Sequence, residues 1–181
     1  MNQIRNVALS ILVVGSCYAQ SPHQKRLSFD LSKIGMFVEG QQICEDKGRL
    51  QDYPSPEIEK ITAAGTKSIP VLIELVTDGK QAKTREPIVC FWPGMAIGDI
   101  AFCLLDNLFL NPEWTNSRIP GASWNEMLDS PGDLPAWEQL HGFIRKHGRA
   151  ALRNKWRKLW VKHGGQIFWD PKERCFKLKQ N

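Results

Sequence analysis

Apolar residues recur at every third or fourth position in five segments of this 181-residue chain, which predicts five helices. Local signals support the first of them, because Ser55 is a good N-cap, Pro56 suits a first turn and Gly65 can end a helix. The third segment is the most apolar, and we expect it to be central. The predicted helices span residues 56–64, 68–77, 95–110, 134–147 and 149–163.

The last residues have the pattern of strands. Segments 166–169 and 174–178 are separated by the turn sequence Asp170-Pro171-Lys172-Glu173, which predicts a β-hairpin. With 42% hydrophobic residues, seven Trp and eight Phe, the chain can form a core. We therefore expect a mainly α fold of about five helices with a short C-terminal β-hairpin, in a single domain over residues 20–181. An irregular N-terminal arm over residues 20–54, a short extended piece at 87–92 and irregular structure between 111 and 132 complete the prediction.

Residues 57–76 carry a resemblance to a known repeat. An apolar helix, Gly65, the Ile69-Pro70 pair and a second helix rich in Leu and Ile resemble one HEAT-type helical hairpin. A second unit would start at residues 98–105, roughly 40 residues later, as in that class of repeat. The resemblance covers residues 55–110 and implies helix packing and partner binding. It implies no catalysis.

Residues 1–19 have the layout of a secretory signal peptide. Arg5 is the only charge before Lys25, and an apolar run over residues 7–14 precedes several small residues. Cleavage after Ala19 would release a soluble periplasmic or secreted protein. Residues 14–17 also resemble a bacterial lipobox, in which Cys17 would be lipidated and would tether the protein to a membrane. Either route exports the chain.

Four cysteines remain after processing at either position, and two interpretations stay open for them. Export permits two disulfides, with three pairings that the sequence does not distinguish. The alternative is that they are buried free thiols. No C-x-x-C spacing occurs, which argues against a zinc ribbon and a thioredoxin-type redox pair. The four residues are Cys44, Cys90, Cys103 and Cys175.

Charge is distributed unevenly along the chain. Residues 141–181 contain twelve Lys and Arg against Asp170 and Glu173, a net charge of +10, although the whole chain carries only +5. One interpretation is a basic surface for an anionic partner. The other is that this region packs on the acidic remainder of the chain and its charge is largely compensated, which we favour.

The segment 149–163 is both amphipathic and strongly basic. Leu152, Trp156, Leu159 and Trp160 form an apolar stripe, with basic residues, including Lys155, Lys158 and Lys162, on its flanks and opposite side. Such a helix can lie in a membrane interface, but core packing explains the stripe better. Export argues against nucleic acid as the partner. The candidate binding residues are Arg149, Arg153, Trp156, Arg157 and Trp160.

A polar stripe is also expected on the central helix. Asp99, Cys103 and Asp106 stand four and three residues apart and share one face. Two carboxylates and one thiol mix hard and soft ligands, so we expect no metal there. Asp99 lies near the helix N-terminus, and if it is buried an arginine from the C-terminal region is its natural partner.

The preferred function is an exported, non-enzymatic binding protein of the inhibitor, immunity or envelope-accessory type, with a protein or anionic envelope component as partner and no cofactor. No hydrolase, phosphate-binding or dinucleotide-binding motif occurs. A peripheral binder of anionic membranes is a second alternative. The first alternative is a small exported hydrolase with a polar site among Asp99, Asp106, Glu126, His141 and His147.

Overall fold

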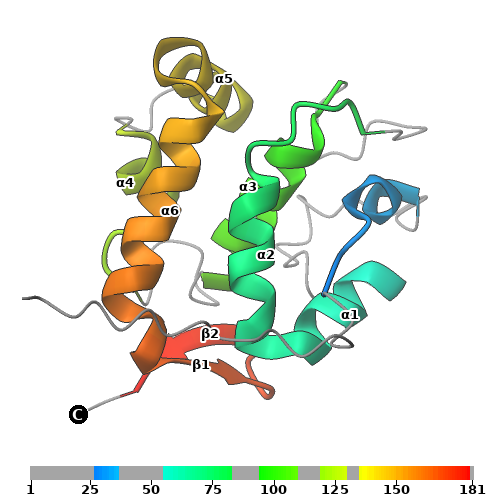
Figure 1. The fold of residues 1–181 in the computed structure, drawn as a ribbon, viewed down its shortest axis with the longest axis vertical. Helices are drawn as coiled ribbons and strands as arrows, with labels where there is room; N and C mark the ends of the chain where they lie inside the picture. The colour runs from blue at the N-terminus through cyan, green and yellow to red at the C-terminus, as the bar shows by residue number, and fades with distance from the viewer. Residues whose placement is uncertain (1–26, 37–54, 83–93, 110–118, 130–134, 180–181) are drawn as a thin grey trace, which may run out of the picture.

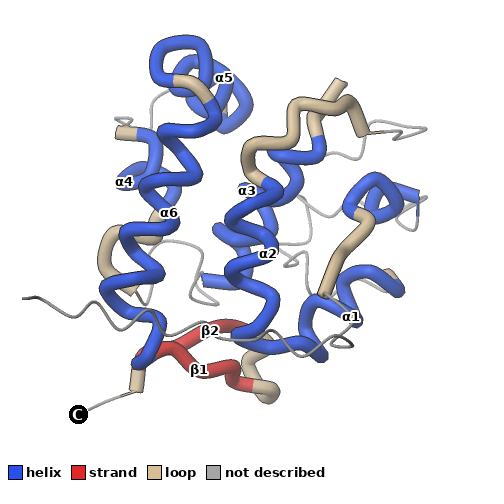
Figure 2. The backbone as a smooth tube through the Cα atoms, viewed as in Figure 1, coloured by secondary structure: helices blue, strands red, loops and turns tan. Residues whose placement is uncertain are grey.

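The computed structural model describes residues 27–36, 55–82, 94–109, 119–129 and 135–179. Within these ranges the chain is mainly helical and ends in a two-stranded antiparallel sheet, as Figures 1 and 2 show. In the sheet, Ile167 lies opposite Leu178 and Asp170 opposite Cys175. The elements are the 3₁₀ helix η1 (Leu31–Met36), α1 (Pro56–Ala64), the 3₁₀ turn η3 (Gly65–Lys67), α2 (Ser68–Leu75), α3 (Ile97–Phe109), α4 (Trp124–Leu128), α5 (Ala136–His147), α6 (Arg149–His163), the 3₁₀ turn η4 (Gly164–Gln166), β1 (Ile167–Asp170) and β2 (Cys175–Leu178).

The predicted fold class is confirmed, with all five predicted helices present and the hairpin at the expected place. Two short elements were not predicted. The 3₁₀ helix η1 lies in the segment expected to be irregular, and α4 has only five residues, too few to display a helical period. The predicted extended piece at 87–92 lies outside the described residues.

Helix α2 packs against both α3 and α6, and the hairpin lies below α2 and α6 in the view of Figure 1. The core contains residues from every helix and from both strands. Each of Ile69, Leu72, Ile73 and Val76, the predicted inner face of α2, is buried. α3 is buried along most of its length, which confirms its predicted central position.

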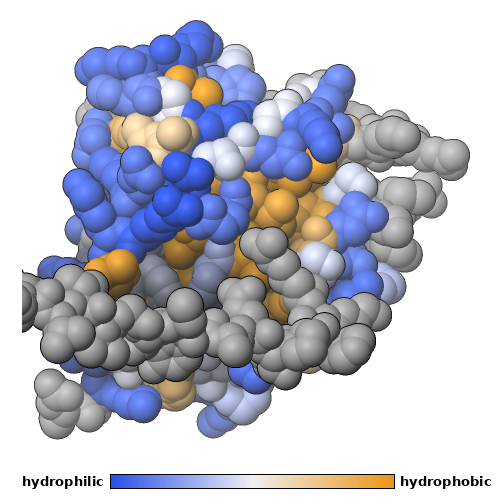
Figure 3. Space-filling model, in the orientation of Figure 1, coloured by the Kyte–Doolittle hydropathy of each residue, from blue (hydrophilic) through white to orange (hydrophobic). Residues whose placement is uncertain are grey.

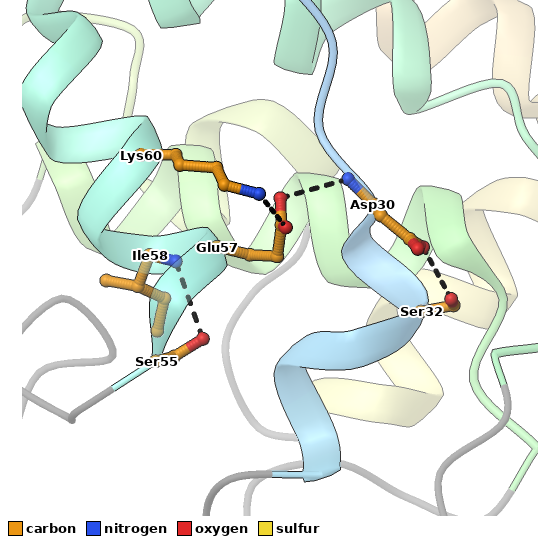
Figure 4. Close-up of polar contacts among 6 residues, drawn as sticks. All are labelled: Asp30, Ser32, Ser55, Glu57, Ile58 and Lys60. Atoms are coloured by element: carbon orange, nitrogen blue, oxygen red, sulfur yellow. Dashed lines mark hydrogen bonds and ion pairs between the residues drawn. The ribbon is translucent and has the colours of Figure 1, made fainter.

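The start of α1 is held by side chains from two elements (Figure 4). The Ser55 hydroxyl accepts a hydrogen bond from the Ile58 amide at 3.4 Å, as the predicted N-cap. The buried carboxylate of Glu57 accepts one from the Asp30 amide at 3.2 Å and pairs with Lys60 at 2.5 Å. Glu57 therefore joins the segment before η1 to α1.

Aromatic rings connect α3, α6 and the hairpin. The Trp156 side chain from α6 is fully buried, with its ring 6.3 Å from Phe102 and 5.4 Å from Phe109 of α3. Phe109 lies 5.1 Å from Phe176 of β2, which in turn contacts Trp169 of β1. The apolar stripe of α6 thus faces the core, as favoured from the sequence.

Lys155 fixes α4 on the side of α6. Its ammonium group donates to the carbonyl oxygens of Glu126 at 3.2 Å and Met127 at 2.9 Å, and pairs with Asp129 at 2.6 Å. Carbonyls at the end of a helix lack helical partners and carry partial negative charge, so a cation there is favourable. Lys155 of α6 therefore holds α4 at the C-terminal end of α4.

Replacing Trp156 by alanine should lower the free energy of unfolding by about 3–5 kcal/mol, because it removes a large buried side chain and leaves a cavity. Urea denaturation followed by far-UV circular dichroism measures the loss. Trp137→Ala is the matched control, since Trp137 is 44% exposed and should cost far less. Equal losses in the two variants would contradict the packing of α6.

Candidate functional site

Asp99 is positioned by the start of α3. Its Oδ2 accepts a hydrogen bond from the Ala96 amide at 2.8 Å, which satisfies one of the amides that a helix N-terminus leaves free. The helix dipole favours a negative charge at this position. The side chain is only 1% exposed, so the carboxylate needs a partner inside the protein.

That partner is an arginine from the C-terminal region, as predicted. Arg149 Nη2 lies 2.7 Å from Asp99 Oδ1, and His141 Nε2 of α5 lies 3.7 Å from Asp99 Oδ2. Arg149 is the first residue of α6, so the pair joins the start of α3 to the start of α6.

Gly98 makes this junction possible. A Cβ atom at this position would lie 2.3 Å from the Val76 carbonyl oxygen and 2.8 Å from Arg149 Nη1. Both distances are too short for real atoms, and the Gly98 amide also donates to the Asp78 carbonyl at 2.8 Å. Only glycine permits α3 to begin this close to the end of α2 and to the Arg149 guanidinium.

The hydrolase alternative loses much of its geometric basis. The structure brings Asp99 and His141 together, but Asp99 is buried and already paired with Arg149. A substrate would have to displace that arginine to reach the carboxylate.

The remaining candidates for the hydrolase site have other environments. Glu126 belongs to a capping box at the start of α4, where the Ser123 hydroxyl donates to it and thereby lowers the pKa of its carboxyl group. The ring of His147 is 4.8 Å from that of Phe143, in the last turn of α5. Glu126 thus caps a helix, and His147 packs against an aromatic ring.

Asp106 and Cys103 are buried on α3, as part of the predicted polar stripe. Burial raises the pKa of the Asp106 carboxyl from its usual 3.8 to about 7, and its Oδ1 has no hydrogen-bond partner. Burial raises the pKa of the Cys103 thiol well above its usual value, and the negative charges of Asp106 and Asp99 raise it further. The thiol therefore stays protonated, which disfavours it as a nucleophile.

The cysteine predictions are tested only in part. Cys103 and Cys175 are both buried, and no disulfide is seen between them. Cys17, Cys44 and Cys90 lie outside the described residues, as does the predicted signal peptide. Among the residues that the structure describes, no group of three or more metal-ligating side chains comes together.

Much of the basic charge of the C-terminal region is compensated by acids from earlier in the chain. Arg157 binds Glu74 of α2 with two hydrogen bonds, Nε to Oε1 at 2.8 Å and Nη2 to Oε2 at 2.6 Å. Arg153 lies 4.0 Å from the same carboxylate, and Arg174 pairs with Glu59 at 3.0 Å. With the Arg149 and Lys155 pairs, these contacts agree with the favoured interpretation of compensated charge.

One part of α6 differs from this pattern. Asn154, Arg157, Lys158, Val161 and Lys162 line an open hollow of about 460 Å³, here called the α6 outer surface. Val161 is 86% exposed within it. In the part of the chain that the structure describes, neither Lys158 nor Lys162 forms an ion pair, so this surface keeps a positive charge. Figure 3 shows hydrophilic side chains gathered over α5 and α6 on the face it views.

The five predicted binding residues divide between core and surface. Trp156 is buried in the core, which corrects its assignment to a binding surface, and Trp160 is partly buried against the core. Arg149 faces the Asp99 carboxylate of α3, and Arg153 faces the Glu74 carboxylate of α2. Of the five residues, Arg157 alone lines the hollow.

Sequence reasoning did not single out Val161 or Asn154. The sequence feature that could have indicated this surface is Val161, an aliphatic residue next to the apolar stripe and among lysines.

No protein-family model, curated protein or solved structure matches this chain. The resemblance of residues 55–110 to HEAT-type hairpins therefore stays a prediction. No described helix combines the length and apolar character needed to cross a membrane.

Arg149→Met should lower the free energy of unfolding by about 3 kcal/mol, because it leaves the buried Asp99 carboxylate without its cation. Asp99→Asn alone should also destabilise, while the double variant should lose less than the sum of the two, by about 1–3 kcal/mol of coupling. Urea denaturation of the four proteins measures this cycle. Strict additivity would show that the two side chains do not interact.

Asp106→Asn should make the folded protein less sensitive to pH. The folded-state pKa of Asp106 is raised, so the contribution of this group to stability is fully present below about pH 4 and is lost progressively as pH rises towards 7. Asparagine carries no charge to desolvate, so the variant should exceed the wild type at pH 8 by roughly 3–4 kcal/mol and by little at pH 4. Denaturation midpoints across this range check the prediction, and a constant difference would contradict it.

Proposed function

We propose that the protein is an exported, non-enzymatic binding protein that holds an anionic partner on the α6 outer surface. Export rests on the signal-peptide pattern of residues 1–19. The observation that carries the binding site is the hollow itself, which contains an exposed valine and two lysines that form no ion pair with the described residues.

The distribution of ion pairs supports this choice of surface. Arg149, Arg153 and Lys155 point towards acids or carbonyls of neighbouring elements and stabilise the fold. Lys158 and Lys162 of the same helix have no such partner among the described residues, so their charge acts on the solvent. A local excess of positive charge attracts anionic partners and speeds their association.

Two features favour a binding protein over the alternatives. The buried Asp99 carboxylate is occupied by Arg149, which leaves the hydrolase hypothesis without an accessible carboxylate beside His141. Interfacial membrane helices present aromatic residues on the lipid side, whereas Trp156 of α6 lies in the core and Trp160 packs partly against it.

The double variant Lys158→Glu/Lys162→Glu should weaken binding of fluorescein-labelled poly-L-glutamate at least tenfold, or by about 1.4 kcal/mol, because it reverses the charge of the surface. Fluorescence anisotropy at low salt measures the dissociation constant. Lys172→Glu/Lys179→Glu changes the net charge equally at exposed positions that do not line the hollow and should leave binding within about twofold. Equal weakening in both variants would mean that only overall charge matters and would overturn the proposal.

A further inference from the structure

The α6 outer surface combines two chemistries in a small area. Lys158 and Lys162 are four residues apart, so their backbones are separated by about 6 Å along the helix axis. Val161 stands between them in sequence and is almost fully exposed. A complementary ligand would offer two negative charges at a similar spacing, with an aliphatic group between them.

Resting on the proposed function, we infer that the partner is an acidic protein segment in which two carboxylates one helical turn apart flank an aliphatic side chain. Glu or Asp at positions i and i+4 of a helix has the required spacing of about 6 Å. An aliphatic residue between them would cover Val161 and remove its methyl groups from water. A short acidic helix lying along α6 would present its side chains in this way.

Arg157, at the edge of the α6 outer surface, already binds one carboxylate of the protein. It holds Glu74 in a bidentate arrangement, which fixes the guanidinium in one orientation beside the hollow. A side chain that is already ordered loses little conformational entropy when a partner arrives. The rim of the site is therefore preorganised on its Arg157 side, while the lysines supply mobile charges.

The same residues fit other anionic partners less well. A membrane surface would require several apolar side chains at helical spacing on the outer side of α6, where the hollow presents Val161 among Asn154 and the cations. An acidic polysaccharide would use the cations and Asn154 but would gain little from an aliphatic contact. A protein segment can supply both carboxylates and an aliphatic side chain.

The experiment uses the full mature chain and three fluorescein-labelled 15-residue helical peptides. The first carries Glu at i and i+4 with Leu between them, the second has Ser in place of Leu, and the third has the composition of the first with Leu moved to the opposite face. We expect the first peptide to bind at least fivefold more tightly than the other two. Val161→Ser should remove that difference and should leave binding of the second peptide unchanged, and because Val161 is exposed the variant should fold normally.

The variants separate this inference from the proposed function. If Val161→Ser leaves all three affinities unchanged while Lys158→Glu/Lys162→Glu still weakens them tenfold, the surface recognises charge alone and the inference fails while the proposed function stands. If the Lys172→Glu/Lys179→Glu control weakens binding equally, both fail. Tighter binding to phosphatidylglycerol vesicles or polygalacturonate than to the first peptide, lost in the Lys158→Glu/Lys162→Glu variant, would assign the surface to a membrane or a polysaccharide and overturn the inference.

Discussion

A carboxylate buried at the start of α3 constrains how the rest of the molecule is assembled. Asp99 is removed from water and must be paired, and Arg149 reaches it only if α6 begins beside the junction of α2 and α3. Gly98 allows the approach. Two turns further along α6, Trp156 enters the core between Phe102 and Phe109. These two attachments fix both the position of α6 and its rotation about its own axis.

That rotation decides which cations are used within the fold and which face solvent. Residues on the inner flanks of α6 bind Asp99, Glu74 and the end of α4, so the large positive charge of the C-terminal sequence is not a measure of surface potential. On α6 itself, Lys158 and Lys162 beside Val161 face solvent without an ion pair to the described residues. The proposed binding surface is therefore a consequence of how the core is packed, and not of the overall charge of the chain.

Local signals explain what was predictable from sequence. Ser55, Pro56 and Gly65 act within one or two turns of the chain, and the boundaries of α1 agree with them to the residue. A buried Asp99 requires a cation, which made an arginine partner predictable, but its identity depends on how a helix 50 residues later docks. α4 was not predicted because its capping box, Ser123 with Glu126, is followed by too few helical residues to show a helical period. Helical spacing already placed Trp160 in the stripe that faces the core, whereas Val161, its apolar neighbour outside the stripe, is exposed.

The shared use of Glu74 by Arg153 and Arg157 gives this surface a built-in competitor. Any incoming carboxylate meets an arginine that is already occupied on one edge, so it gains little by displacing Glu74 and more by reaching Lys158 and Lys162. Small anions that can engage only one cation are thus at a disadvantage against ligands that span the surface. On the proposed binding surface, one acidic side chain of α2 would thus favour larger ligands with several negative charges.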